Sequence, residues 1–368
     1  MNRFLSQKFR FYSFVCITLL LFVHGYNLNE TYLTPFSLVN ERLTFTTFIE
    51  YFLANGALRF RIPMLFIISG YIFSLQDIKP YAERIKKRFH SLIIPFFIWS
   101  AFGLLVTYLL QQHPVTAKAV WDSQMDQMGD NRPYSQMNWK DILARLTLRP
   151  VSFQLWFIRS LFFYNLLYPF FKWAILNYPK AWFGLAFIGW FFMFNFLFFE
   201  AQGIFFFTLG IWINKTEFPI DKRPRWFSHF LSWLFFIGVS VIKTFMAFEL
   251  EASNPETKYI LMTLHMVTVS AGIVAVWYGA DAVVKWFMHK RWFLWTIPFA
   301  FIIYAMHVPL IHYATRLVFI YINDFTYYRL VTYLLVPVFI FFFCIGCGAL
   351  LRKTVPKVYR IATGGRGF

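Results

Sequence analysis

The chain has 368 residues, of which 59% are hydrophobic and only 14% are charged. Soluble domains contain roughly a quarter charged residues, so the composition excludes both a soluble domain and a disordered chain. Three cysteines are too few for a disulfide scaffold, and the composition is that of a polytopic membrane protein.

Ten apolar stretches predict membrane-spanning helices, each of which needs about 20 mostly apolar residues. They lie near residues 9–27, 62–76, 92–110, 154–173, 182–199, 203–214, 226–248, 259–284, 292–319 and 330–351, and the second and sixth are short. The ninth contains Pro298 and Pro309, so we expect it to be kinked or split. The predicted fold is an all-α bundle of about ten transmembrane helices. It forms a single domain over residues 1–368 with no soluble catalytic extension.

The net charge of +18 could indicate a nucleic-acid partner, but no nucleic-acid-binding motif accompanies it. Ten spans place most of the basic residues in segments on the same side as the two termini. The positive-inside rule therefore predicts that both termini are cytoplasmic. Two long segments, 28–61 and 111–153, then form outer loops, and an amphipathic stretch at 45–58 is expected to lie in the membrane interface.

A histidine at the outer end of the first span is the first candidate for chemistry. His24 follows a run of leucine, phenylalanine and valine. A neutral imidazole can accept a proton from a hydroxyl and return it near neutral pH. The alternative is an interfacial histidine that only hydrogen-bonds water or a carbonyl.

A basic cluster precedes the third span. Arg84, Lys87 and Arg88 form its core, and such a cluster can hold phosphates through charge-assisted hydrogen bonds. Ordinary positive-inside residues would produce the same pattern, so both interpretations remain open.

Further charged and aromatic residues lie at or inside spans, where an ionised group costs at least about 2.5–3.5 kcal/mol. Arg59, Arg61 and Arg159 could bind anionic or carbonyl oxygens, or could extend to the lipid headgroups. Trp156 could stack on a sugar or serve as an interface aromatic, and His307 lies in the middle of a span. No spacing typical of a metal site or a nucleotide-binding loop is present.

These residues fall in an ordered set of motifs by which the sequence resembles the membrane acyltransferase 3 family over nearly its whole length. The motifs are Ser13-Phe14 through His24, Arg59 with Pro63-Met64-Leu65-Phe66-Ile67-Ile68-Ser69-Gly70-Tyr71, Arg84–Arg88 with Leu92-Ile93-Ile94-Pro95, Leu155-Trp156-Phe157-Ile158-Arg159, Phe206-Phe207-Thr208-Leu209-Gly210, and Ile303-Tyr304-Ala305-Met306-His307-Val308-Pro309-Leu310.

The resemblance implies a bundle in the bacterial plasma (inner) membrane that moves an acyl group, usually acetyl, from cytoplasmic acyl-CoA to a sugar hydroxyl. His24 would match the family's catalytic histidine, and the Arg84–Arg88 cluster would match its donor-binding motif. Many members have an arginine where this chain has Ser13, and Arg10 is the nearest substitute.

The expected reaction uses acyl-CoA as a co-substrate, with no permanently bound cofactor and no metal. His24 would deprotonate the acceptor hydroxyl or carry the acyl group transiently. Arg59, Arg61, Trp156, Arg159 and His307 would position or support the acceptor. The expected partners are acyl-CoA, a surface glycan or lipid-linked saccharide, and the bilayer, but no nucleic acid.

Two other functions remain as alternatives. A transporter or flippase of lipid-linked saccharides also needs many spans and buried charges, but such proteins usually contain internal repeats. A polysaccharide polymerase would need a larger outer loop than residues 111–153 provide.

Overall fold

The computed structural model describes residues 2–126, 128–130 and 132–367. In this part of the chain nearly all regular structure is helical, apart from one hairpin of two-residue antiparallel strands, β1 (Asn195–Phe196) and β2 (Phe199–Glu200). The first helices are α1 (Arg3–His24), α2 (Phe45–Tyr51), the π-helix η1 (Phe52–Ala57), α3 (Arg61–Ser74), α4 (Tyr81–Arg88), the π-helix η2 (Phe89–Ile93), α5 (Ile94–Leu110), α6 (Pro114–Ser123), η3 (Tyr134–Gln136) and α7 (Trp139–Thr147).

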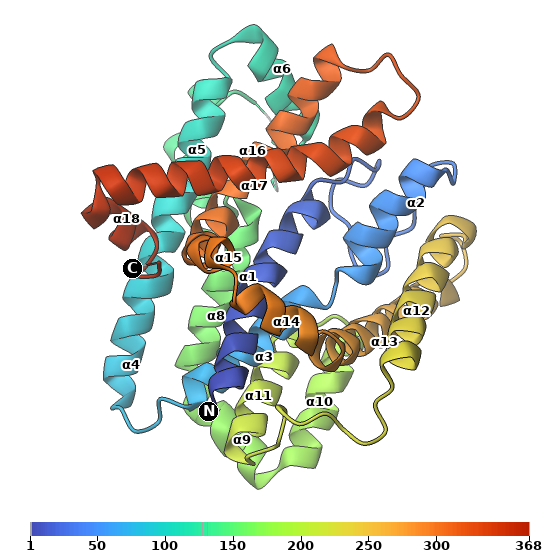
Figure 1. The fold of residues 1–368 in the computed structure, drawn as a ribbon. Coiled ribbons are helices and arrows are strands. Elements are labelled where there is room, and N and C mark those ends of the chain that lie inside the picture. Colours follow the sequence, from blue (N-terminus) through green and yellow to red (C-terminus); the bar gives the residue numbers. More distant parts are fainter. Residues whose placement is uncertain (1, 127, 131, 368) are drawn as a thin grey trace.

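The remaining helices follow the long 111–153 segment (Figure 1). They are η4 (Phe153–Leu155), α8 (Trp156–Leu166), α9 (Tyr168–Asn177), α10 (Pro179–Phe191), α11 (Ala201–Lys215), α12 (His229–Glu249), α13 (Glu256–Gly279), α14 (Asp281–Met288), α15 (Arg291–Thr296), η5 (Ile297–Phe299), α16 (Ala300–Tyr321), α17 (Tyr328–Thr354) and α18 (Pro356–Ala362).

Among the described residues, seven helical segments are long and apolar enough to cross a membrane, and this makes the chain a multi-pass, all-α membrane protein. They are Arg3–His24, Phe45–Ser74, Tyr81–Leu110, His229–Glu249, Glu256–Gly279, Arg291–Tyr321 and Tyr328–Thr354. The other three predicted spans are helical too, but they consist of the shorter helices α8 to α11, of 10 to 15 residues each. The count of ten spans therefore stays a prediction.

The amphipathic stretch at 45–58 forms α2 and η1 and leads into α3, and its residues from Asn55 to Ala57 are buried. It packs against α12 and α17. The small residues Ala54 and Gly56 allow α12 to approach closely. The place of this stretch in the membrane interface stays a prediction.

The kink predicted in the ninth span is confirmed. α16 breaks at Val308, which has non-helical dihedral angles before Pro309. Gln154 Nε2 donates to the carbonyl oxygens of Ala305 (3.0 Å) and Val308 (3.2 Å), and Ser152 Oγ donates to Val308 O (3.1 Å). The carbonyl groups freed at the helix break thus accept hydrogen bonds from residues at the start of the fourth predicted span. The break places the His307 turn against the end of α1.

Candidate active site

Two histidines from opposite ends of the chain meet in the protein interior. His24 is the last residue of α1, and His307 is fully buried one residue before the break in α16. Their Nδ1 and Nε2 atoms lie 2.9 Å apart, and the two rings are nearly parallel. Both residues were singled out from the sequence, and the structure brings them together.

The hydrogen-bond pattern assigns the proton positions in this pair when both rings are neutral. His307 Nδ1 lies 2.9 Å from the carbonyl oxygen of Ile303, which can only accept, so Nδ1 is the donor. His307 Nε2 then carries a lone pair and accepts from Nδ1–H of His24. By this logic His24 Nε2 is unprotonated and available to a ligand.

His24 lines a cavity of about 200 Å³, which we call the histidine cavity. Arg59, Arg61, Trp156 and His312 also line it. His24 therefore faces a polar cavity within the protein and not the surrounding lipid.

The two arginines of the histidine cavity have few partners. Arg59 Nη2 donates to Leu33 O (2.7 Å), and Arg61 Nε donates to Leu58 O (2.6 Å). Arg59 Nε and Arg61 Nη1 are buried without a hydrogen bond, and neither arginine forms an ion pair with the residues that the structure describes. Two cationic groups with donors to spare thus face the same cavity as His24.

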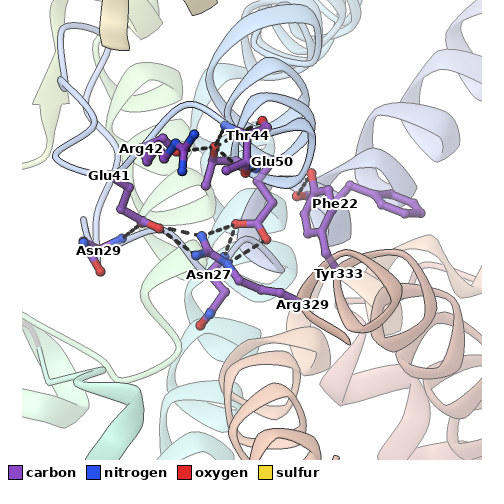
Figure 2. Close-up of polar contacts among 10 residues, drawn as sticks. Phe22, Asn27, Asn29, Glu41, Arg42, Thr44, Glu50, Arg329 and Tyr333 are labelled. Atoms are coloured by element: carbon purple, nitrogen blue, oxygen red, sulfur yellow. Dashed lines mark hydrogen bonds and ion pairs between the residues drawn. The ribbon is translucent and has the colours of Figure 1, made fainter. Parts of the chain in front are cut away.

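The loop that follows α1 forms one wall of this cavity through Tyr26, Tyr32 and neighbouring residues. Figure 2 shows how Arg329 at the start of α17 fixes this loop by pairing with Glu41 (2.6 Å) and Glu50 (3.1 Å). The same carboxylates accept hydrogen bonds from the backbone N–H groups of Asn29 and Asn27, which follow closely on His24.

A second cavity adjoins the first and shares Tyr32, Phe153 and Trp156 with it. This Glu200 cavity measures about 410 Å³ and is also lined by Arg159 and Glu200. Arg159 Nη1 donates to the carbonyl oxygens of Thr147 and Leu148, and its Nε is buried without a partner. Burial, opposed by the charge of Arg159, raises the pKa of Glu200 to about 7.

A third cavity, of about 390 Å³, lies at the other end of α1. We call it the Arg10 cavity, and Ser6, Arg10, Ser13, Phe301 and Arg366 are among its lining residues. Steps of three and four residues lead along one face of α1 from Arg10 through Ser13 to Leu20 and His24, which line the histidine cavity. The two cavities are separate but share this helix face.

The members of the predicted donor cluster have different surroundings. Arg84 is buried, and its Nη1 forms an ion pair with Asp77 (2.8 Å). Asp77 also binds Lys172 (2.8 Å) and Lys215 (2.6 Å), so four elements of the bundle meet at this carboxylate. Lys87 is exposed, and the half-buried Arg88 lies over the ring of Phe73, 5.2 Å from its centre.

Three residues of these cavities were not proposed as site residues from the sequence. His312 lines the histidine cavity, Glu200 lines the Glu200 cavity, and Arg366 lines the Arg10 cavity. A charged or histidine residue beside an apolar helix was the available signal, but many such residues are simply solvated.

Comparison with known proteins gives two matches. A family profile described as an acyltransferase domain matches residues 14–353. The chain is also similar to the succinoglycan biosynthesis protein ExoH of Rhizobium meliloti (strain 1021), with 22% identity over 241 residues. That alignment covers 64% of this chain and 61% of the relative. No solved structure matches the chain. Because the profile extends over nearly all of the sequence, the chain belongs to the acyltransferase 3 family.

Proposed function

We propose that this protein transfers an acyl group, acetyl in the simplest case, from acyl-CoA to a hydroxyl group of a polysaccharide or lipid-linked saccharide. The observation that carries the proposal is the 2.9 Å contact between His24 Nδ1 and His307 Nε2 beside a cavity lined by two arginines. With both rings neutral, this contact leaves the lone pair of His24 on Nε2. Membership of an acyltransferase family and the similarity to ExoH, whose name refers to succinoglycan biosynthesis, support the reaction class.

In the proposed reaction His24 acts as a general base. Its Nε2 takes the proton of the acceptor hydroxyl while the hydroxyl oxygen attacks the thioester carbonyl carbon. The C–S bond then breaks, the acyl group stays on the sugar oxygen as an ester, and the leaving thiolate takes the proton from the imidazolium. His307 is a positioning residue that keeps the His24 lone pair on Nε2.

A covalent route uses the same nitrogen. Nε2 attacks the thioester carbonyl carbon and CoA thiolate leaves. The acceptor hydroxyl then attacks the acyl-imidazole, the C–N bond breaks to restore the His24 imidazole, and the hydroxyl proton goes to the thiolate. The two routes differ in whether the donor alone labels the protein. Incubation with acyl-CoA without acceptor, followed by mass spectrometry of the intact chain, would detect an acyl adduct only in the covalent route.

Arg59 and Arg61 suit the negative charge that develops on the thioester oxygen. Both arginines line the histidine cavity, and Arg59 Nε and Arg61 Nη1 are buried without a hydrogen-bond partner in the described part of the chain. Such preorganised donors stabilise an oxyanion strongly. We therefore assign these arginines to the acyl carbonyl.

The three cavities give the two substrates separate approaches. The donor would bind with its phosphates near Arg10, Lys87 and Arg88 on the cytoplasmic side, and its pantetheine arm would follow the face of α1. From Arg10 to His24 this face spans about 21 Å. The saccharide would enter through the Glu200 cavity, where Trp156 offers a stacking surface and Arg159 and Glu200 offer hydrogen-bonding groups.

The test compares surface glycans from bacterial cells that make the wild-type protein or one of two variants. His24→Ala should abolish the ester-sized mass increase of the glycan without lowering the amount of protein in the membrane. His289→Ala is the matched control, because His289 is exposed at the end of α14, and it should keep full acylation. Acylation by the His24→Ala variant would refute the proposal, and movement of unmodified saccharide without ester formation would favour a transporter.

A further inference from the structure

We propose that Arg366, in the segment that follows α18, binds a phosphate of the acyl donor in the Arg10 cavity. The inference rests on the proposed function and adds a donor-binding residue that is far in sequence from the basic cluster before α5. Arg366 lines this cavity together with Arg10 from α1, so cations from the two ends of the described chain face one space.

Two glycines allow the segment after α18 to bring Arg366 to the Arg10 cavity. Gly364 and Gly367 have φ angles of +61° and +86°, a region that favours glycine. A Cβ atom at Gly364 would lie 2.5 Å from Ser91 O, and one at Gly367 would lie 2.6 Å from Pro298 O. Only residues without a side chain allow the backbone to pass this closely between η2 and η5, and this path places Arg366 at the cavity.

The Arg366 side chain is held but keeps donors to spare. Its Nη1 donates to Ser91 O (2.7 Å) and Thr363 O (3.2 Å), and its guanidinium lies over the Phe301 ring, 4.7 Å from the centre. These bonds use Nη1 alone, so three of the five N–H groups remain for a ligand. Within the described residues Arg366 has no ion pair with a carboxylate, which leaves its charge uncompensated.

Neighbouring positive charge makes an anion the fitting ligand. Burial, together with the charge of Arg88, lowers the pKa of Arg366 to about 10, so the guanidinium is still charged at neutral pH. Arg10 and Arg88 thus add to a concentration of positive charge that a multiply charged anion would relieve. Two ligands could supply a phosphate group to this cavity. One is the nucleotide end of CoA, and the other is the headgroup of an anionic lipid.

The position of the cavity favours CoA. The Arg10 cavity lies on the face of α1 that continues to His24, and Ser13 lines it between the arginine and the apolar part of the path. A phosphate anchored at Arg366 would leave the slim, uncharged arm of the donor free to extend along this face. A lipid headgroup would instead leave its acyl chains outside, in the bilayer.

Binding of unacylated CoA to the full-length protein in phosphatidylcholine nanodiscs tests the inference by calorimetry. Arg366→Gln should weaken CoA binding by about tenfold or more, the loss expected for charge-assisted hydrogen bonds. Binding of pantetheine, which lacks the nucleotide phosphates, should not change. Lys357→Gln is the matched control, because Lys357 is exposed on α18. Thermal unfolding of each variant verifies that the fold is retained.

Several outcomes would overturn the inference. Wild-type affinity for CoA in Arg366→Gln would show that Arg366 does not bind the donor, and equal losses for CoA and pantetheine would show a structural role. An effect that appears only when the nanodiscs contain phosphatidylglycerol would assign the site to lipid headgroups. If the wild-type protein itself does not bind CoA, the proposed donor fails and not merely the assignment of Arg366.

Discussion

Arg84 and Arg61 are both buried arginines in a membrane protein, with 5% and 2% of their surface exposed, but their charges are balanced differently. Arg84 forms an ion pair with Asp77, which also binds two lysines. Each has one buried nitrogen without a hydrogen bond, but Arg61 forms no ion pair with any described residue. The first arginine is neutralised within the fold, whereas the second faces a cavity.

The difference separates structural cations from candidate functional ones. A buried charge is costly, so a cation that only supports the fold is expected to have an acidic partner. Arg329 follows this pattern through Glu41 and Glu50. Arg59 and Arg61 do not, and the cost of leaving them uncompensated is understandable if a substrate supplies the negative charge.

The largest expected effect is on stability, at the Asp77 cluster. Asp77→Asn removes the carboxylate shared by Arg84, Lys172 and Lys215. Breaking a fully buried pair costs about 3–5 kcal/mol, and we expect a loss at the lower end of this range because Arg84 is buried but Asp77 is partly exposed. Burial raises the pKa of Asp77, but hydrogen bonds from Lys172, Lys215 and Tyr168 outweigh it and hold the value below the ordinary one. The stabilisation is therefore present above the ordinary pKa of about 4 and is lost as the pH falls through the folded value.

Thermal unfolding in detergent at pH 7 would measure this loss. The surviving folded fraction of Asp77→Asn should still acylate with a normal turnover number. An unchanged unfolding temperature would mean that the cluster does not hold α4, α9 and α11 together.

The next effect is on turnover, at the histidine cavity. Arg61→Gln should lower kcat by about 10²- to 10³-fold, the cost of removing one oxyanion donor, because its guanidinium would no longer face the thioester oxygen. The unfolding temperature should stay the same or rise, since an unpaired buried charge is removed. If Arg61→Gln instead lowers the unfolding temperature and keeps the wild-type kcat, Arg61 is a structural cation like Arg84. The proposed difference between the two arginines would then be wrong.

A smaller effect distinguishes Arg88 from Arg84 on the same helix. Arg88 has no ion pair in the described residues, and we expect Arg88→Gln to raise the donor KM by about tenfold while kcat and the acceptor KM stay constant. Lys87→Gln should act in the same direction, whereas Lys79→Gln, on the preceding turn, serves as the control. Initial rates at varied acyl-CoA concentration would measure the donor KM. A change in the acceptor KM alone would contradict the assignment of Lys87 and Arg88 to the donor.

The sequence alone could predict much of the fold but not this division among cations. The positions of α1, α5, α12 and α17 follow from their apolar runs, and the Pro309 kink follows from proline chemistry. Short helices such as α10 and α11 are joined by a hairpin that leaves no simple period in the sequence.

Long-range pairing accounts for the rest. His24 and His307 are separated by 283 positions, and nothing in either motif indicates the hydrogen bond between them. Arg84 and Arg88 look alike in a basic run, and only the folded position of Asp77 distinguishes them. The residue types of the site were therefore readable from the sequence, whereas their partners depended on the packing.

The smallest effect is expected at Glu200. This acid lines a cavity together with Arg159, and among the described residues the two side chains form no ion pair. Because its pKa is about 7, its charge changes near neutral pH. A carboxylate accepts hydrogen bonds from sugar hydroxyls more strongly than its protonated form does, so the acceptor KM should rise a few-fold as the pH falls from about 8 to 6. Glu200→Gln should remove this pH dependence of the acceptor KM without changing kcat. If Glu200→Gln keeps the wild-type pH profile of the acceptor KM, Glu200 does not contact the saccharide.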